Sequence, residues 1–434
     1  RIPEKSYDTL IDEFKAELAA LKDKFKTFMT CYTPESGIRR KSKELKAFKF
    51  RYESADDRED IRHVLEGGGE WEAVDIPDYR GPVGKWTGYY RTIFSYPEIT
   101  SCKRVFICFL GVDYIADIYL NNRHIGSHEG FFAPFEFDVT DFIRQDACNV
   151  LLVQIKNDIP TVGLDGQDLD GDKIYACTGP GWDDPVEGWH HCPPGAGIYN
   201  KVLFEERSEL FIDSIFIRPD IDNSCIEARV QVYNTSTFNK NIRLSATIHP
   251  FNFKGESSET IIPADIEPAG PGINYYRFKC AIHDYRLWQP DEPWLYSARI
   301  SLENCEEPDH DQGRQIFDVE DSVFGMRKFH MDETGEEKGT LYLNNRPVIL
   351  RGANDMGHMQ QCVMKNDPDQ LIEDILIAKL ANMNYYRFTQ RPVQKEIYHY
   401  CDMLGMMNQT DLPLFGQLRR NQFCEALRQT AEME

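Results

Sequence analysis

The residues with the clearest capacity for chemistry lie in one long segment, between Gly163 and Pro194. Asp168, Asp170 and Asp172 alternate there with a leucine and a glycine. Carboxylates at every second position around a glycine are typical of a Ca²⁺ loop, because Ca²⁺ takes several oxygen ligands. The closing glutamate of such a loop does not appear. The three aspartates therefore predict either a Ca²⁺ site or an acidic surface turn.

The same segment carries two cysteines and two histidines, namely Cys177, His190, His191 and Cys192. Structural zinc sites place their ligands in pairs at short, characteristic spacings. These four residues lack that spacing, so we do not expect zinc. Loops of this length are usually functional or disordered, which keeps the segment among the candidate sites.

The element that precedes the first domain is predicted to be a helix. Between residues 6 and 29, six apolar side chains fall on one helical face: Leu10, Phe14, Leu18, Leu21, Phe25 and Phe28. Ser6 is a suitable N-cap. We interpret residues 1–45 as a helical extension that docks on the following domain and ends in a basic linker at Arg39, Arg40 and Lys41.

Two all-β domains are expected next. From 46 to 207, short runs such as Val105-Phe-Ile-Cys-Phe-Leu alternate with turns, and Asn121-Asn122 suits a two-residue hairpin. Many antiparallel strands without helices predict a jelly-roll β-sandwich. Residues 208–325 alternate again, as in Glu227-Ala-Arg-Val-Gln-Val-Tyr, and their length fits one immunoglobulin-like β-sandwich.

From 326 to 434 strands alternate with helices. Asp367, followed by proline at the first helical position, predicts a helix start, and Gly405 closes a helix over 393–404. Strand-like runs begin at Asn384 and Met406, and a third helix begins near Asn421. This alternation predicts the first part of a (β/α)₈ TIM barrel. Three units cannot close eight strands, so we expect the remaining barrel sequence in a C-terminal continuation.

The overall composition describes a multidomain globular protein that acts on neutral small molecules. Its formal net charge of −22 argues against nucleic acid and anionic membranes as partners, since both require a positive surface. We expect no membrane span, because no run of about 18 apolar residues occurs. The 12 cysteines are scattered, and Cys108 lies inside an apolar strand. Such cysteines predict a reducing compartment, hence a cytoplasmic protein.

Three groups of motifs point to one family. The first domain contains Leu110-Gly-Val-Asp-Tyr-Ile-Ala-Asp-Ile-Tyr-Leu-Asn-Asn, Gly126-Ser-His-Glu-Gly and Pro134-Phe-Glu-Phe-Asp-Val-Thr-Asp. The second ends with Trp288-Gln-Pro-Asp-Glu-Pro-Trp-Leu-Tyr and Phe324-Gly-Met-Arg-Lys-Phe, and the third opens with Leu343-Asn-Asn-Arg-Pro-Val-Ile-Leu-Arg-Gly-Ala-Asn. In this order they resemble glycoside hydrolase family 2, which includes β-galactosidases, β-glucuronidases and β-mannosidases. The resemblance covers about residues 46–434.

The resemblance implies a retaining β-glycosidase that needs no cofactor. Retention requires two carboxyl groups about 5–5.5 Å apart, one as nucleophile and one as acid/base. In the family these are glutamates at the ends of the fourth and seventh barrel strands. Because this sequence reaches only the third strand, we expect both glutamates beyond Glu434.

The resemblance also implies sugar-binding residues at the ends of the first three barrel strands. Asn354 ends the first strand, and His358 follows it in a loop with a longer spacing than the family's. Arg387 ends the second strand, and a carboxylate, here Asp411, ends the third. The alternatives are a buried ion pair for Arg387, an ordinary loop position for His358 and a turn cap for Asp411.

After Arg387 this sequence differs from the usual pattern of the family. It usually continues with Ser-His-Tyr-Pro, whereas here Gln390 stands where the histidine would be, as a sugar contact or a loop residue. Trp182 and Asp183, in the long acidic segment, could reach over the barrel mouth, where an aromatic ring stacks on a sugar face. Ordinary loop packing is the alternative for both.

Two functions follow from these residues. The first is a retaining exo-β-glycosidase, β-galactosidase-like, with a carbohydrate substrate as partner. The second is a non-catalytic carbohydrate-binding or scaffolding fragment of such an enzyme. Large enzymes of this build often form homo-oligomers, but the sequence does not determine the oligomeric state.

Overall fold

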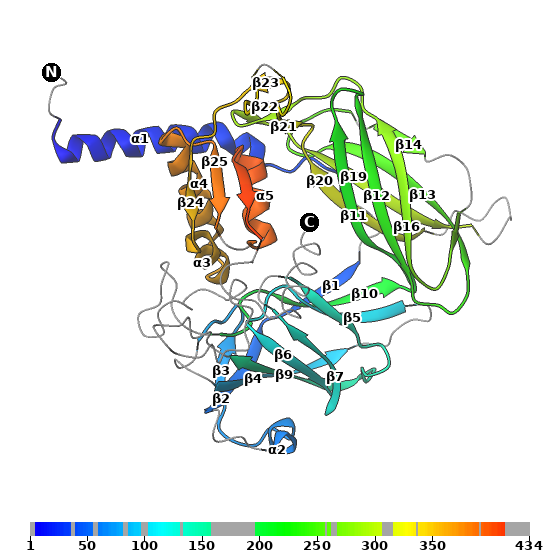
Figure 1. Ribbon diagram of the computed structural model, residues 1–434. Helices are drawn as coiled ribbons and strands as arrows, with labels where there is room; N and C mark the ends of the chain where they lie inside the picture. The colour runs from blue at the N-terminus through cyan, green and yellow to red at the C-terminus, as the bar shows by residue number, and fades with distance from the viewer. Residues whose placement is uncertain are drawn as a thin grey trace.

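The computed structural model describes residues 5–35, 40–54, 60–80, 86–96, 103–130, 133–157, 196–256, 258–261, 267–305, 316–335, 337–389 and 392–412. Figure 1 shows two β-sandwiches beside a smaller segment in which strands and helices alternate, with one long helix along its outside. Within the described ranges, no helix combines the length and the apolar character needed to cross a membrane.

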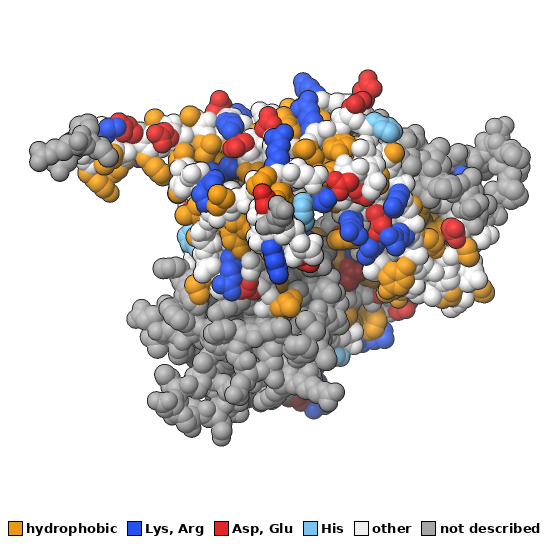
Figure 2. All heavy atoms as spheres, turned by 45° about the horizontal axis from the view of Figure 1, so that its top comes forward, with side chains coloured by type: hydrophobic (Ala, Val, Ile, Leu, Met, Phe, Trp, Pro, Cys, Tyr) orange, Lys and Arg blue, Asp and Glu red, His pale blue; other side chains and the backbone are white. Residues whose placement is uncertain are grey.

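The long helix confirms the periodicity of the N-terminal residues. Helix α1 (Tyr7–Lys26) begins at Ser6, whose hydroxyl accepts a hydrogen bond from the backbone of Thr9, and it continues into the 3₁₀ turn η1 (Thr27–Met29). The buried side chains Leu18, Phe25 and, in η1, Phe28 pack on the strand–helix segment. The expectation that the helix docks on the domain following it in the chain was therefore wrong. The N-terminal half of α1 projects beyond the strand–helix segment, and Figure 2 shows apolar side chains along it.

The first sandwich has two antiparallel sheets. The larger has the order β3 (Glu72–Asp75), β2 (Ala47–Ser54), β4 (Trp86–Tyr96), β9 (Ala147–Asn157), β6 (Ile115–Leu120) and β7 (Arg123–Glu129). The smaller has the order β1 (Lys41–Leu45), β10 (Val202–Ser208), β5 (Lys103–Phe109) and β8 (Phe135–Asp138). A short helix, α2 (Ile61–Leu65), packs on the outer face of the larger sheet.

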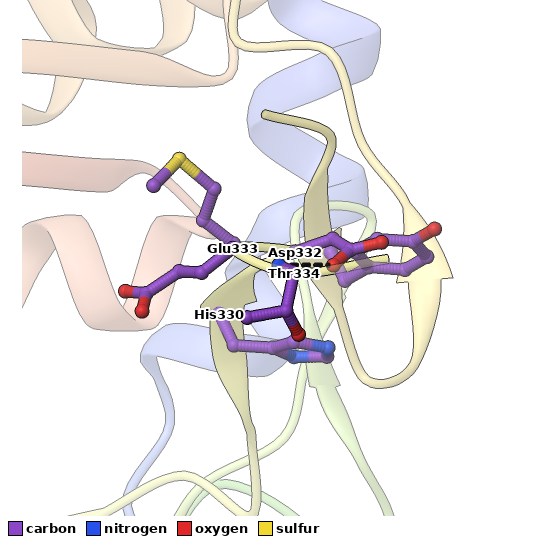
Figure 3. Close-up of a pocket in the computed structure, with 6 residues that line it drawn as sticks. His330, Asp332, Glu333 and Thr334 are labelled. Atoms are coloured by element: carbon purple, nitrogen blue, oxygen red, sulfur yellow. Dashed lines mark hydrogen bonds between the residues drawn. The ribbon is translucent and has the colours of Figure 1, made fainter. Parts of the chain in front are cut away.

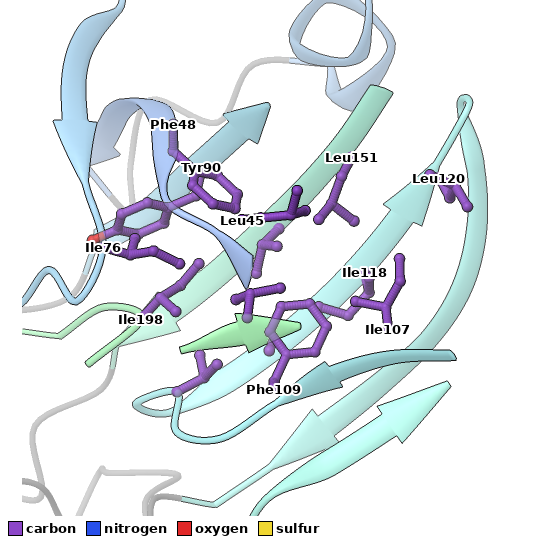
Figure 4. Close-up of a cluster of buried hydrophobic side chains, with 14 of the residues drawn as sticks. Leu45, Phe48, Ile76, Tyr90, Ile107, Phe109, Ile118, Leu120, Leu151 and Ile198 are labelled. Carbon is purple, nitrogen blue, oxygen red and sulfur yellow. The ribbon is translucent and has the colours of Figure 1, made fainter. Parts of the chain in front are cut away.

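Apolar side chains at every second position of the strands form the core of this sandwich. Figure 4 shows Ile107 and Phe109 of β5 facing Ile118 of β6 and Leu151 of β9 across the space between the sheets. All four side chains are buried, because every second residue of a strand points to the same face. The sandwich expected from the sequence is therefore confirmed.

One boundary differs from expectation. Residues 41–45, assigned from the sequence to the helical extension, form β1, which pairs antiparallel with β10 from Lys41 opposite Glu206 to Leu45 opposite Val202. The strand belongs to the sandwich because its backbone bonds to residues far along the chain. Local periodicity cannot indicate such a pairing.

The second sandwich is also antiparallel. One sheet contains β11 (Leu210–Asp220), β12 (Cys225–Asn234) and β16 (Gly272–Ala281). The other contains β14 (Ser258–Ile261), β13 (Lys240–Pro250), β19 (Tyr296–Asn304) and β20 (Ile316–Phe324), with β15 (Glu267–Ala269) paired to β13. A two-stranded hairpin of β17 (Trp288–Gln289) and β18 (Glu292–Pro293) lies between β16 and β19 in the chain.

The strand–helix segment follows a small antiparallel sheet of β21 (Phe329–Met331), β22 (Leu341–Leu343) and β23 (Arg346–Pro347). Its three parallel strands are β24 (Gly352–Asp355), β25 (Tyr385–Phe388) and β26 (Met407–Thr410). The helices between them are α3 (His358–Met364), α4 (Pro368–Leu380) and α5 (Lys395–Leu404). The expected parallel α/β arrangement is thus confirmed for these strands, while the helix predicted near residue 421 lies outside the described residues.

Local signals explain where these helices begin and end. The Asp367 carboxylate accepts a hydrogen bond from the backbone of Gln370 at 3.0 Å, with Pro368 at the first helical position of α4. Gly405 ends α5 with φ of 69°, a conformation that favours glycine. The prediction missed α3: His358, expected in a loop, is its first residue.

Candidate active site

Polar side chains gather on one face of the parallel sheet. Tyr386 and Phe388 of β25 are buried among the helices, and on β26 the Thr410 hydroxyl lies 2.7 Å from that of Tyr398 in α5. Because side chains alternate between the two faces of a strand, Arg387 points away from the helices. In (β/α)₈ barrels that face surrounds the axis, and its carboxyl end holds the substrate.

Arg387 and Asp411 form an ion pair at this carboxyl end. Arg387 Nε lies 3.1 Å from Asp411 Oδ1, and Nη2 lies 2.6 Å from Oδ2, a bidentate geometry. Hydrogen bonding to Asp411 raises the pKa of Arg387. The alternative weighed for Arg387 was a buried ion pair. The pair exists, yet 41% of the Arg387 side chain is exposed, so pairing and contact with a sugar are compatible.

Two further side chains on this face escaped the sequence analysis. Gln409 donates from Nε2 to Asp411 Oδ1 at 3.1 Å, and the Tyr385 hydroxyl donates to Gln409 Oε1 at 2.7 Å. Tyr385 lies two positions before Arg387 on β25, and Gln409 of β26 lies two positions before Asp411, which directly follows that strand. That spacing places them on the same face and was the signal available in the sequence.

The two remaining predictions on described residues have different outcomes. Asn354 lies opposite Arg387 in the parallel pairing of β24 with β25, and its side chain is exposed. It therefore belongs to the same row of residues. His358 instead turns to α4, where its Nε2 lies 2.9 Å from Asp374 Oδ2. The structure thus brings together Asn354, Arg387 and Asp411, and holds His358 in a hydrogen bond between helices α3 and α4.

The other predicted site residues lie outside the described residues. They are Gln390, Trp182, Asp183 and the three aspartates Asp168, Asp170 and Asp172. Among the residues that the structure does describe, no group of three or more His, Cys, Asp or Glu side chains is arranged to hold a metal ion.

A surface hollow of about 390 Å³ lies elsewhere, on the β21–β22 hairpin. Figure 3 shows Asp332, Thr334 and His330 around it. Asp332 accepts hydrogen bonds there from the backbone of Thr334 and Gly335, and His330 stacks on Tyr342. The hairpin precedes β24, so the hollow belongs to the amino ends of the parallel strands. We therefore place the candidate site at Arg387.

The first sandwich reaches the rim near this site. Asn200 Nδ2 donates to Glu396 Oε1 at 3.3 Å, and Glu396 lies in the first turn of α5, just after the carboxyl end of β25. Asn200 is buried. Burial, reinforced by the charges of Asp113 and Glu396, raises the pKa of the neighbouring Tyr199 hydroxyl. A loop of the first sandwich therefore contacts the first turn of α5, the helix that follows β25.

Curated relatives match most of this chain. The chain spans about half or less of the length of the curated relatives it matches first. A β-glucuronidase of Bacteroides fragilis is 24% identical over 386 residues, which cover 85% of this chain and 48% of that protein. A β-galactosidase of Clostridium acetobutylicum is 22% identical over 361 residues, 82% of this chain and 34% of that protein.

Solved structures agree on the fold. The crystal structure of a Bacteroides uniformis β-glucuronidase superposes with a TM-score of 0.68 at 19% identity, covering 91% of this chain and 45% of that one. Family descriptions match three successive regions: "Glycosyl hydrolase 2 galactose-binding domain-like" at 82–171, "Glycosyl hydrolases family 2" at 210–327, and "Glycosyl hydrolases family 2, TIM barrel domain" at 336–431. With all three of its domain types in order along the sequence, the chain belongs to glycosyl hydrolase family 2.

Proposed function

We propose that this chain is the front part of a retaining exo-β-glycosidase that hydrolyses terminal β-linked sugars, β-galactosidase-like in its substrate. The observation that carries the proposal is the row of Asn354, Arg387 and Asp411 at the carboxyl ends of parallel strands. Family membership adds support, because relatives at low identity carry the names β-galactosidase and β-glucuronidase.

The residues of this chain would bind and orient the sugar. Sugars present hydroxyl groups that both donate and accept hydrogen bonds. The Asp411 carboxylate accepts them, and Arg387 and Asn354 supply donors. The two catalytic carboxyl groups, about 5–5.5 Å apart in a retaining enzyme, are proposed to lie beyond Glu434. A TIM barrel brings the ends of all its strands to one rim, which is how residues so far apart in sequence would meet.

We also make proposals about cofactors, a metal site, further pocket residues, the oligomeric state and the location of the whole protein. We propose that hydrolysis needs no cofactor, and that Asp168, Asp170 and Asp172 hold Ca²⁺ in a structural role. Trp182, Asp183 and Gln390 are proposed as further walls of the sugar pocket. We also propose a homo-oligomer located in the cytoplasm. Free thiols support that location: the described cysteines, eight in number, are all unbridged.

Turnover by the full-length enzyme tests the proposal. Nitrophenyl β-galactoside, β-glucuronide, β-mannoside and β-glucoside would be compared, and NMR of the first-formed anomer would show whether configuration is retained. We expect turnover of the β-galactoside with retention, and a loss of kcat/KM in Arg387→Met. Sugar binding without turnover of any of these substrates would favour the binding or scaffolding fragment instead.

A further inference from the structure

The four polar side chains at the candidate site form one connected chain of hydrogen bonds. Tyr385 bonds to Gln409, Gln409 to Asp411, and Asp411 to Arg387. In the pairing of β25 with β26, Tyr385 lies opposite Met407 and Arg387 lies opposite Gln409. Tyr385 and Arg387 therefore each bond to the residue two positions beyond the one that lies opposite them. This repeated diagonal links the two strands along one face.

Only one assignment of donors and acceptors fits these hydrogen bonds. An ionised carboxylate accepts hydrogen bonds and cannot donate them, so the Gln409 amide must point its nitrogen at Asp411. Its oxygen then faces Tyr385, and the tyrosine hydroxyl must donate. Burial raises the pKa of Tyr385, so this hydroxyl keeps its proton over the range in which such enzymes are assayed. Gln409 is thereby oriented from both ends.

We propose that Gln409 is a positioning residue, which holds the Asp411 carboxylate in place against Arg387 so that both meet the bound sugar, and that Tyr385 fixes the Gln409 amide. This inference rests on the proposed glycosidase function. Asp411 Oδ1 accepts from both Gln409 Nε2 and Arg387 Nε, so rotation of the carboxylate would break two hydrogen bonds together. Arg387 binds Asp411 through Nε and Nη2, so Nη1 lies outside this bidentate contact.

Substitution by glutamate gives the sharpest test. Gln409→Glu keeps the shape of the side chain, but when ionised it sets a second carboxylate against Asp411, and repulsion between like charges raises the pKa of both. When protonated, it donates a hydrogen bond as the amide does. We therefore expect Gln409→Glu to approach wild-type kcat/KM near about pH 5 and to lose about 10- to 100-fold by about pH 8, relative to wild type.

The neighbouring residue supplies a matched control. Asn408 is exposed and lies opposite Tyr386, on the other face of β26. Asn408→Glu adds the same charge to the same strand without facing Asp411, so its pH profile should follow the wild type. Gln409→Leu should lower kcat/KM at every pH, and Tyr385→Phe should have a smaller effect in the same direction.

Outcomes separate the two hypotheses. If the full-length wild type turns over no β-glycoside, the proposed function is wrong. If the wild type turns over a substrate but Gln409→Glu and Asn408→Glu have the same pH profile, the positioning role of Gln409 is wrong. Unfolding temperatures measured over the same pH series test the contact without turnover. Gln409→Glu should lose stability relative to Asn408→Glu as the pH rises, and equal curves would overturn the contact itself.

Discussion

Arg40 Nη2 lies 2.7 Å from Asp318 Oδ2, so the residue that leads into the first sandwich is bound to a strand of the second. Both side chains are largely buried, with 15% of Arg40 and 5% of Asp318 exposed. Asp318 Oδ2 also accepts a hydrogen bond from the backbone of Ile212 at 2.9 Å. A residue of the predicted basic linker thus joins the two sandwiches.

Removing Asp318 should be destabilising. Asp318→Ala removes one carboxylate partner of Arg40, which keeps Glu320 at 2.8 Å, and leaves the buried Ile212 amide without this acceptor. An unsatisfied buried donor typically costs about 1–3 kcal/mol. Chemical denaturation would measure the free energy of unfolding. The exposed pair Lys5–Glu13 supplies the control, because Glu13→Gln should change stability by about 1 kcal/mol or less. Equal effects of the two substitutions would contradict the role given to Asp318.

Glu320 should make stability depend on pH. Burial, partly opposed by Arg40 and reinforced by Asp318 and Glu205, raises the pKa of Glu320 from 4.5 to about 7. The folded state therefore binds more protons than the unfolded state between these values, and this contribution to stability is present below pH 4.5 and lost as the pH rises through about 7. Glu320→Gln should flatten that slope, measured as the free energy of unfolding at several pH values. An unchanged slope would show that Glu320 ionises freely.

Lys379 should make the free energy of unfolding rise with pH in the alkaline range, opposite to the effect of Glu320. Burial lowers its pKa from 10.5 to about 8, although its Nζ donates to the carbonyl oxygens of Pro290 at 2.8 Å and Gly405 at 3.2 Å. Between these pKa values the unfolded state binds more protons, so stability should rise with pH there. Lys379→Met should remove this rise, whereas Lys365→Met, at an exposed lysine, should leave it. Thermal unfolding between about pH 8 and 10 measures the difference.

Trp288 should couple the second sandwich to the strand–helix segment. The ring is 1% exposed, and its Nε1 donates to the carbonyl oxygen of Asp402 in α5 at 2.8 Å. Trp288→Ala should cost about 3–5 kcal/mol by opening a cavity. Trp288→Phe, which loses the hydrogen bond but fills most of the space, should lose less. A single unfolding transition that splits into two in Trp288→Ala would show the coupling directly, and two transitions in the wild type would contradict it.

Chelation tests the proposed Ca²⁺ site. Removal of bound calcium with EDTA should lower the unfolding temperature but leave kcat/KM nearly unchanged, because the proposed role is structural. Asp168→Asn combined with Asp170→Asn should make the protein insensitive to added Ca²⁺. Identical unfolding curves with and without Ca²⁺ in the wild type would favour the acidic surface turn.

The sequence by itself determined the features that depend on neighbours in the chain. The cap at Asp367 and the turn at Gly405 need only residues within about one helical turn, and the apolar face of α1 needs only residues of that one helix. The order of the domains was equally accessible, because alternating strands and strand–helix units differ in period. Arg387 and Asp411 were singled out by the resemblance to the family, which places binding residues at the ends of the barrel strands.

Only the tertiary structure decided which of these residues meet. The diagonal bonds from Tyr385 to Gln409 and from Arg387 to Asp411 require a particular pairing of two parallel strands, and the bond from Arg40 to Asp318 joins residues 278 positions apart. His358 turned to Asp374 because α3 and α4 pack together, which its own surroundings in the sequence do not indicate. Long-range contacts of this kind depend on how whole elements pack, and no local spacing encodes that arrangement.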